Sequence, residues 1–216
     1  MSDIKIIETL SMILALMIAI IGHEIMHGYI AYRYGDDTAK RAGRLSINPI
    51  VHIDPVGTIL IPAILYFTNA PFLFGWAKPV PVNISIVIRN GGYGAAIAVA
   101  LAGITYNLLV AIFAATILPL FLHPNSYFEA FMFFFLYNLT LYNVILAVFN
   151  LWPIPPLDGS QALYYLAMKL RWDRFVEFYE KIYPYGMLIL FAILFIPGIN
   201  SIIFAPAEWI LKMILP

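Results

Sequence analysis

Two histidines and a glutamate lie within the five residues His23-Glu24-Ile25-Met26-His27, inside a stretch with a helical hydrophobic pattern. Positions four apart share one face of a helix, so the two imidazoles can bind the same metal ion. Glu24 lies about 100° around the helix from His23, where its carboxylate can act as a general base toward water. Two imidazoles, a carboxylate and water form a common catalytic zinc shell. The alternative is that the histidines pack between helices beside a buried, paired glutamate.

A third protein ligand has few candidates in this sequence. The chain has no cysteine, so a metal site would need histidine and carboxylate ligands. Between residues 91 and 168 the only charged side chains are Glu129 and Asp158. Glu129 lies at the predicted start of a helix, where the helix dipole favours a carboxylate without any metal. Asp158 follows a proline-rich break and precedes an apolar helix, which it can cap while binding a metal. We therefore predict that His23, His27 and Asp158 bind one Zn²⁺ per chain.

The elements that must position these residues lie in a membrane. Of the 216 residues, 62% are hydrophobic and 11% are charged, and the mean hydropathy is +0.88. A soluble domain carries about 25% charged residues, and a chain of 24.4 kDa cannot bury this much apolar surface. The 12 basic and 12 acidic residues leave no net charge and no basic cluster, which excludes a nucleic-acid partner. The composition predicts a polytopic protein surrounded by a lipid bilayer.

Four stretches are long and apolar enough to cross a bilayer, which takes about 20 helical residues. They are residues 6–31, 92–122, 127–151 and 185–204. Residues 207–216 are too few to cross and are predicted to form an interfacial tail. Glu24 falls in the middle of the first span, where an ionisable residue costs about 3 kcal/mol on insertion scales and is functional by default.

The segment 56–74 is apolar and long enough to cross, but two prolines and an asparagine interrupt it. Such breaks are tolerated in a membrane where protein or water satisfies the backbone. If the segment enters and leaves on one side, the connections 32–53, 75–91 and 152–184 share that side. That side then carries 10 Lys and Arg residues, and the other side carries 2. If it spans fully, the division is 4 against 7. Because basic loops mark the cytoplasm, we favour the re-entrant interpretation, with the active site toward the cytoplasmic side of the cell membrane.

Residues 75–91 alternate in places and are rich in proline, which suits an extended segment or an edge strand better than a helix. Residues 40–53 are predicted to pair with them as a small sheet, whose edges can hold an extended peptide. The expected fold is an all-α integral membrane bundle of about 4–6 transmembrane helices with a small β or extended membrane-associated segment. We expect one domain over residues 1–216, with a core from residue 6 to 170 and C-terminal helices from 171 to 216.

Several further motifs follow the His-Glu-x-x-His pattern in a fixed order. They are Gly43-Arg44-Leu45 with Asn48-Pro49, His52-Ile53-Asp54-Pro55, the run from Gly75 to Asn83, Ala102-Gly103 with Asn107, and the run from Asn150 to Gly159. With them, the chain resembles the site-2 protease family of intramembrane zinc metalloproteases, in its short prokaryotic form. The resemblance implies that His23, His27 and Asp158 bind zinc and that Glu24 is the catalytic base. One departure is Ile104, where the family often has proline.

Three further polar residues are candidates for supporting roles. Asn107 is an amide in a helix without charges, and we predict that it either donates to a developing oxyanion or hydrogen-bonds another helix. His52 and Asp54 flank the start of the segment 56–74. They are predicted either to pair behind the metal ligands or to form a structural polar cluster.

These observations together predict a zinc metalloendopeptidase that cleaves within or near the transmembrane segments of membrane-protein substrates, as in regulated intramembrane proteolysis. One alternative is a metal-ion transporter, which the lack of inverted repeats disfavours. Another is a relative that binds membrane segments without cutting them, which the intact Glu24 disfavours. We expect no appended regulatory domain, and the sequence leaves homo-oligomerisation open.

Overall fold

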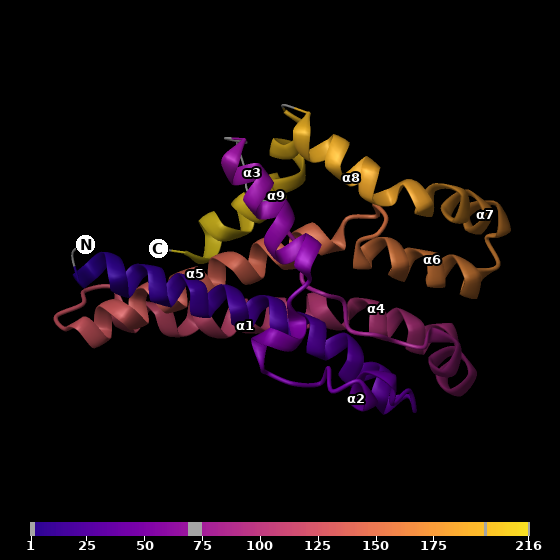
Figure 1. Cartoon of the computed structure of the whole chain (residues 1–216), viewed down its shortest axis with the longest axis horizontal. Helices are drawn as coiled ribbons and strands as arrows, with labels where there is room; N and C mark the ends of the chain where they lie inside the picture. The colour runs from indigo at the N-terminus through magenta and orange to yellow at the C-terminus, as the bar shows by residue number, and fades with distance from the viewer. Residues whose placement is uncertain (1–2, 69–74, 197, 216) are drawn as a thin grey trace.

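The computed structural model describes residues 3–68, 75–196 and 198–215, and all regular structure within these ranges is helical. Three long helices form the centre, and each packs against the other two: α1 (Asp3–Arg33), α4 (Ile84–Ile117) and α5 (Tyr127–Leu151) (Figure 1). Two more helices pack on this centre, α6 (Asp158–Leu170) on α4 and α9 (Ile199–Ile214) on α5. The shorter elements are α2 (Thr38–Arg41), η1 (Pro49–His52), η2 (Pro55–Leu60), α3 (Ile61–Phe67), η3 (Leu118–Phe121), α7 (Asp173–Ile182), η4 (Tyr183–Tyr185) and α8 (Gly186–Phe195).

Small residues allow the three central helices to approach closely. Ala15 and Ala19 on α1 and Ala114 on α4 are fully buried. In lipid, small side chains let helix backbones come together and gain van der Waals contact. Large side chains such as Leu109 and Phe113 instead lie on the outside of α4, each 63% exposed, where hydrocarbon can cover them.

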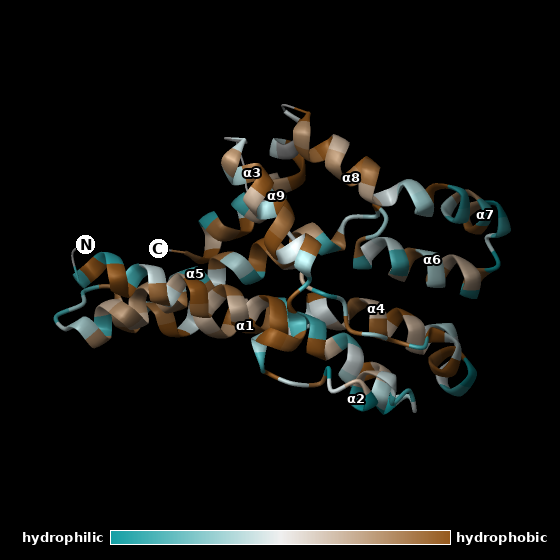
Figure 2. Cartoon of the chain, in the orientation of Figure 1, coloured by the Kyte–Doolittle hydropathy of each residue, from teal (hydrophilic) through white to brown (hydrophobic). Residues whose placement is uncertain are grey.

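Four helical stretches are long and apolar enough to cross a membrane. They are α1, α4 continued by η3, α5, and the stretch Asp173–Phe195 that joins α7 to α8. The predicted helices over 6–31, 92–122 and 127–151 are confirmed, and the chain is a multi-pass membrane protein. Hydrophobic residues dominate α1, α5 and α8, whereas hydrophilic residues gather on α2 and α7 (Figure 2).

The predicted span 185–204 is wrong, because α8 ends at Phe195 and α9 starts a new helix after it. Ile196 has an extended backbone, as a residue before proline favours, and Gly198 has a φ of +90° that glycine adopts without strain. The predicted interfacial tail over 207–216 belongs largely to α9. The stretch here that is long and apolar enough to cross begins earlier in the chain, at Asp173.

Residues 75–83 run extended, as predicted, but residues 84–91 form the first turns of α4, which bends at Gly92. The predicted sheet between 75–91 and 40–53 is wrong for the described residues, which contain no strand. Pro79 and Pro81 explain the difference, because they lack the N–H groups that a strand ladder requires.

The chain leaves the central bundle after η1 and returns to it at nearly the same place. The Trp76 N–H donates a hydrogen bond to the Gly57 carbonyl at 3.1 Å. The two helices of this segment, η2 and α3, have six and seven residues and together form at most about 20 Å of helix. This length is shorter than the core of a bilayer, which is about 30 Å thick. Residues 69–74 of the predicted segment lie outside the described part of the chain. This arrangement favours the re-entrant interpretation of 56–74 over a full span.

The connections predicted to share a side gather at one end of the long helices. α2, the start of α4 and α7 all lie toward this end, and the N terminus and the turn between α4 and α5 lie at the other (Figure 1). The end that carries α2 is therefore the basic end of the bundle.

Cysteines introduced at Lys40, Ser85 and Trp172 should all react from the same side of the membrane with an impermeant thiol reagent. The three side chains are exposed, and the chain contains no other cysteine. Asn125→Cys, in the turn between α4 and α5, is the control and should react from the opposite side. Reaction of residue 85 from the side opposite to residue 40, with residue 125 reacting from the same side as residue 40, would show that 56–74 spans fully.

Candidate metal centre

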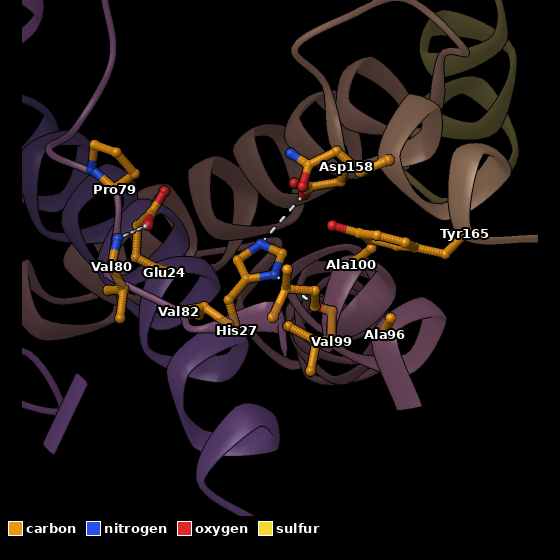
Figure 3. A pocket seen from close by; sticks show the side chains of 12 residues that line it. Glu24, His27, Pro79, Val80, Val82, Ala96, Val99, Ala100, Asp158 and Tyr165 are labelled. Atoms are coloured by element: carbon orange, nitrogen blue, oxygen red, sulfur yellow. Dashed lines mark hydrogen bonds and ion pairs between the residues drawn. The ribbon is translucent and has the colours of Figure 1, made fainter. Parts of the chain in front are cut away.

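The two histidines of α1 converge with Asp158, the first residue of α6. The Nε2 atoms of His23 and His27 lie 3.1 Å apart, and Asp158 Oδ2 lies 3.1 Å from the former and 3.2 Å from the latter. No other trio of histidine, cysteine, aspartate or glutamate ligand atoms gathers this way in the part of the chain that the structure describes. Figure 3 shows the Asp158 carboxylate above the His27 ring.

The proline-rich loop after α5 brings Asp158 to this position. Leu157 is the N-cap residue of α6, and the side chain of Asp158 makes no cap hydrogen bond. The predicted capping role of Asp158 is therefore wrong, because its carboxylate is turned toward the histidines. The Leu157 carbonyl instead accepts the hydroxyl of Ser160 at 2.6 Å, which ties the loop to the helix.

Acceptors behind each imidazole determine which ring nitrogen carries the proton. The Val99 carbonyl lies 2.7 Å from His27 Nδ1, and the Asn107 side-chain oxygen lies 2.6 Å from His23 Nδ1. Each Nδ1 must donate to its acceptor, so in a neutral imidazole each Nε2 carries a lone pair. Both lone pairs face Asp158.

The orientation of the Asn107 amide follows from its other partners. Its Nδ2 donates to the Ala19 carbonyl at 3.1 Å and to the Asn143 side-chain oxygen at 2.7 Å. Asn143 in turn donates to the Leu139 carbonyl, and both asparagines are fully buried. The oxyanion role predicted for Asn107 is not supported, because both amide protons are already used. Of the two predicted roles, the structure shows the interhelical one, with the amide oxygen left for His23.

Two lone pairs and a carboxylate oxygen at contact distance repel one another unless a cation lies between them. Asp158 Oδ2 is buried and has no hydrogen-bond donor. In a tetrahedral zinc site with ligand bonds of about 2.0–2.1 Å, the ligand atoms lie about 3.3–3.4 Å apart. The separations of 3.1–3.2 Å observed here are close to that spacing. The donor set and its geometry fit Zn²⁺.

Gly103 on α4 lies directly against the two imidazoles. A Cβ atom at this position would lie 2.5 Å from His23 Cε1 and from His27 Nε2. Contacts this short do not occur, so any larger residue would displace the rings. The absence of a side chain at Gly103 is what lets α4 support both histidines.

The carboxylate of Glu24 points away from the two Nε2 atoms. It accepts a hydrogen bond from the Val80 N–H at 2.9 Å (Figure 3). A cavity of about 310 Å³ lies beside it, and its walls include Glu24, His27, Asp158, Val80 and Tyr165. A peptide bond in this cavity would contact the base and the candidate metal ligands together.

Comparison with known proteins agrees with this geometry. The model of peptidase family M50 matches residues 119–194, which include Asp158. A protein of Bacillus subtilis named "Putative zinc metalloprotease YwhC" is 38% identical over 158 residues, which are 70% of this chain and 67% of that protein. The chain belongs to peptidase family M50, the site-2 proteases. "Putative zinc metalloprotease Rip2" of Mycolicibacterium smegmatis is 25% identical to this M50 peptidase over 197 residues, 87% of this chain and 67% of Rip2. No solved structure matches the chain.

His52 and Asp54 of the M50 peptidase do not join the histidine and aspartate cluster. His52 Nε2 lies 2.8 Å from the Ser46 carbonyl. Asp54 caps η2, where its carboxylate accepts the N–H groups of Val56 and Gly57. Their hydrogen bonds to nearby backbone groups favour the structural alternative over pairing behind the metal ligands.

Sequence reasoning missed three partners of the site in this M50 peptidase. Asn143 left a signal, since a polar residue in the apolar helix α5 suggests an interhelical hydrogen bond. Tyr165 left another, because it follows Asp158 by seven residues and so shares its helix face. The sequence could not indicate the role of the Val99 carbonyl, because every residue type has the same backbone oxygen.

Replacing Asp158 with alanine should remove most of the zinc from the purified protein, because two imidazoles alone form an incomplete shell. Elemental analysis after dialysis should find about one zinc per chain in the wild type, the occupancy of a single site of this kind, and little in the variant. Glu129→Ala, which removes the other candidate carboxylate, should keep full occupancy. Full occupancy in Asp158→Ala would exclude Asp158 as a ligand.

Gly103→Ala should lower the zinc affinity by about tenfold or more, as displaced ligand supports commonly do. The physical cause is the Cβ placed against both imidazoles. Gly94→Ala, on the same helix with a nearest neighbour 3.9 Å from the added Cβ, is the matched control and should bind zinc normally. Competition with a fluorescent chelator measures both, and equal affinities would contradict the packing argument.

Proposed function

We propose that this M50 peptidase is a zinc metalloprotease that hydrolyses a peptide bond within or near transmembrane segments of membrane-protein substrates. The observation that carries the proposal is the convergence of two imidazole lone pairs and a carboxylate beside Glu24, among helices able to cross a membrane. The names of two relatives, YwhC and Rip2, describe zinc metalloproteases and support the same reaction.

One Zn²⁺ per chain would be held by His23, His27 and Asp158. When bound, the ion would supply a Lewis acid for the substrate carbonyl and lower the pKa of water toward about 7. Glu24 takes the proton of the attacking water and delivers it to the leaving amine. The Val80 N–H holds the Glu24 carboxylate at the cavity wall, away from the ligand atoms, so that it acts as a base and not as a ligand.

The substrate must be extended where it is cut, because a helix keeps its N–H and C=O groups in internal hydrogen bonds. Residues 75–83 supply an edge for such a segment. The N–H and C=O groups of Trp76 bond Gly57 and Thr58. Those of Lys78 bond His52 and Arg44. The N–H and C=O of Ala77 lie on the other edge and have no partner among the described residues. We propose that a substrate strand adds there by β-addition.

A largely apolar cavity of about 580 Å³ supports a membrane segment as the substrate. It lies between α1, the end of α5 and residues 53–62, and Trp76 and Ala77 line it. Pro79 and Val80, a few residues later, line the cavity beside Glu24. An apolar segment in the larger cavity could therefore continue along the extended residues to the candidate catalytic groups.

We also propose that the site opens toward the cytoplasmic side of the cell membrane. The basic end of the bundle carries α2, the start of α4 and α7, and basic connections are typical of the cytoplasm. A cysteine at residue 40 should then react with an impermeant reagent only after the membrane is permeabilised.

Glu24→Gln should retain zinc and substrate binding and lose at least about 10²-fold in cleavage rate, the lower end of general-base contributions. The substitution keeps the shape of the side chain but removes the basic carboxylate. Cleavage is measured with purified protein and a panel of single-span fusion proteins, with and without a zinc chelator. Glu8→Gln, an exposed position on the same helix, is the matched control and should cleave normally.

The same cleavage measurements, with a zinc-flux measurement on the reconstituted protein, separate the alternatives. Cleavage by the wild type that a chelator abolishes supports the proposal. Absence of cleavage with retained binding of the fusion proteins would favour a non-catalytic binding protein, and zinc movement without cleavage would favour a transporter. Normal cleavage by Glu24→Gln with zinc present would remove Glu24 as the base.

A further inference from the structure

Hydrolysis of a peptide bond places negative charge on the carbonyl oxygen, and a positioned hydrogen-bond donor lowers the energy of that state. Asn107 cannot serve, because its amide protons go to Ala19 and Asn143. The polar side chains that line the cavity beside the candidate ligands, apart from Glu24, His27 and Asp158, are Gln161 and Tyr165.

Of these two donors, Gln161 already uses one of its two amide protons. Its Nε2 donates to the Pro156 carbonyl at 3.1 Å, which holds the amide against the proline-rich loop. The Tyr165 hydroxyl has no hydrogen-bond partner among the described residues, and the centroid of its ring lies 5.4 Å from that of the neighbouring Tyr164, in edge-to-face orientation. Tyr165 is therefore the lining donor whose one proton has no acceptor among the described residues.

The position of Tyr165 on α6 directs its hydroxyl toward the candidate ligands. Tyr165 follows Asp158 by two helical turns, about 10 Å along the axis, and lies on the same face. Side chains on a helix lean toward its N terminus, so the ring extends back toward Asp158. Figure 3 shows the hydroxyl directed toward His27 and Asp158, on the opposite side from Glu24.

We propose that Tyr165 is a further catalytic residue, whose hydroxyl donates a hydrogen bond to the carbonyl oxygen of the scissile peptide as negative charge develops on it. The inference rests on the proposed function. In the step, the water oxygen bonds to the carbonyl carbon, the C=O electron pair moves onto the oxygen, and Glu24 takes the proton of the water. The C–N bond then breaks as the electron pair returns and Glu24 protonates the amine. Tyr165 keeps its own proton throughout.

The surroundings of Tyr165 suit a donor that stays protonated. Burial raises the pKa of the Tyr165 hydroxyl above its ordinary value, so the group is neutral near pH 7. Inside a protein cavity, where the effective dielectric constant is lower than in bulk water, a neutral O–H aimed at a developing charge gives more stabilisation than the same group in solvent. Glu24 and Tyr165 would thus act on opposite sides of one peptide bond.

Tyr165→Phe tests the inference, because it keeps the ring and removes only the hydroxyl. We expect kcat on a cleaved single-span fusion protein to fall by about 10²-fold, the loss typical of one oxyanion donor, while KM and zinc content stay within about twofold. A phosphinic pseudopeptide built on the cleaved sequence mimics the tetrahedral oxygen, and its affinity should fall by a similar factor. Tyr164→Phe is the matched control, since its hydroxyl bonds Glu180 at 2.9 Å outside this cavity, and it should leave all three quantities unchanged.

Other outcomes overturn the inference in distinguishable ways. Wild-type kcat and pseudopeptide affinity in Tyr165→Phe would remove the hydroxyl from the reaction while leaving the proposed protease intact. Loss of zinc from the variant would mean that the hydroxyl supports the metal centre instead. A raised KM with unchanged kcat would make Tyr165 an ordinary substrate contact. No cleavage by the wild type on the whole panel would reject the proposed function itself, and this inference with it.

Discussion

Three electron-rich atoms held in contact inside a membrane bundle set the main constraint on this structure. Two imidazole lone pairs and one carboxylate oxygen lie 3.1–3.2 Å apart, and a bound cation makes that arrangement favourable. Each imidazole therefore needs an acceptor behind it, which Val99 and Asn107 provide. The bare backbone at Gly103 leaves room for both rings. The packing of α1 against α4 supplies the Val99 and Asn107 acceptors and the space at Gly103. The hydrogen bond from Asn107 to Asn143 on α5 orients the Asn107 amide.

The second constraint is access, because a peptide can reach the site only where the helical wall is interrupted. Residues 75–83 form such an interruption, and several of their polar groups bond distant side chains and backbone carbonyls instead of a sheet. The fully buried Asp36 accepts the Asn83 N–H at 2.6 Å, and the buried Arg44 donates to the Lys78 carbonyl. Irregular backbone is tolerated at membrane depth under this condition. The same contacts keep the opposite edge of the segment free.

The division of groups between helices gives the site two walls. α1 carries Glu24 and both histidines, and α6 carries Asp158 and, two turns on, Tyr165. The proline-rich loop turns the chain sharply between α5 and α6, and α6 then packs on α4. Because one helix supplies both an ion ligand and a group facing the substrate space, the packing of α6 controls metal spacing and cavity shape together.

Membership of the M50 family was within reach of the sequence, because its evidence is local. The spacing of His23, Glu24 and His27 requires only a helix, and the apolar stretches over α1, α4 and α5 are long enough to predict that these helices exist, although not where α4 begins. Asp158 was found by elimination, since a charge-poor membrane sequence offers few carboxylates. The break that separates α8 from α9 was missed, although a proline and a glycine mark it, because hydrophobicity continues across it.

Only the tertiary structure decided how the remaining polar groups are used. An asparagine side chain can donate to an oxyanion or accept a hydrogen bond from a histidine. The contacts of Asn107 with α1 and α5 use both amide protons, which leaves its oxygen to accept from His23. The extended residues 75–83 were predicted, but their partners lie up to 56 residues away and are side chains or turns. The sequence alone determined which groups can bind a metal and move protons. Their orientation depends on packing between distant segments, because helix spacing specifies a face but not what that face meets.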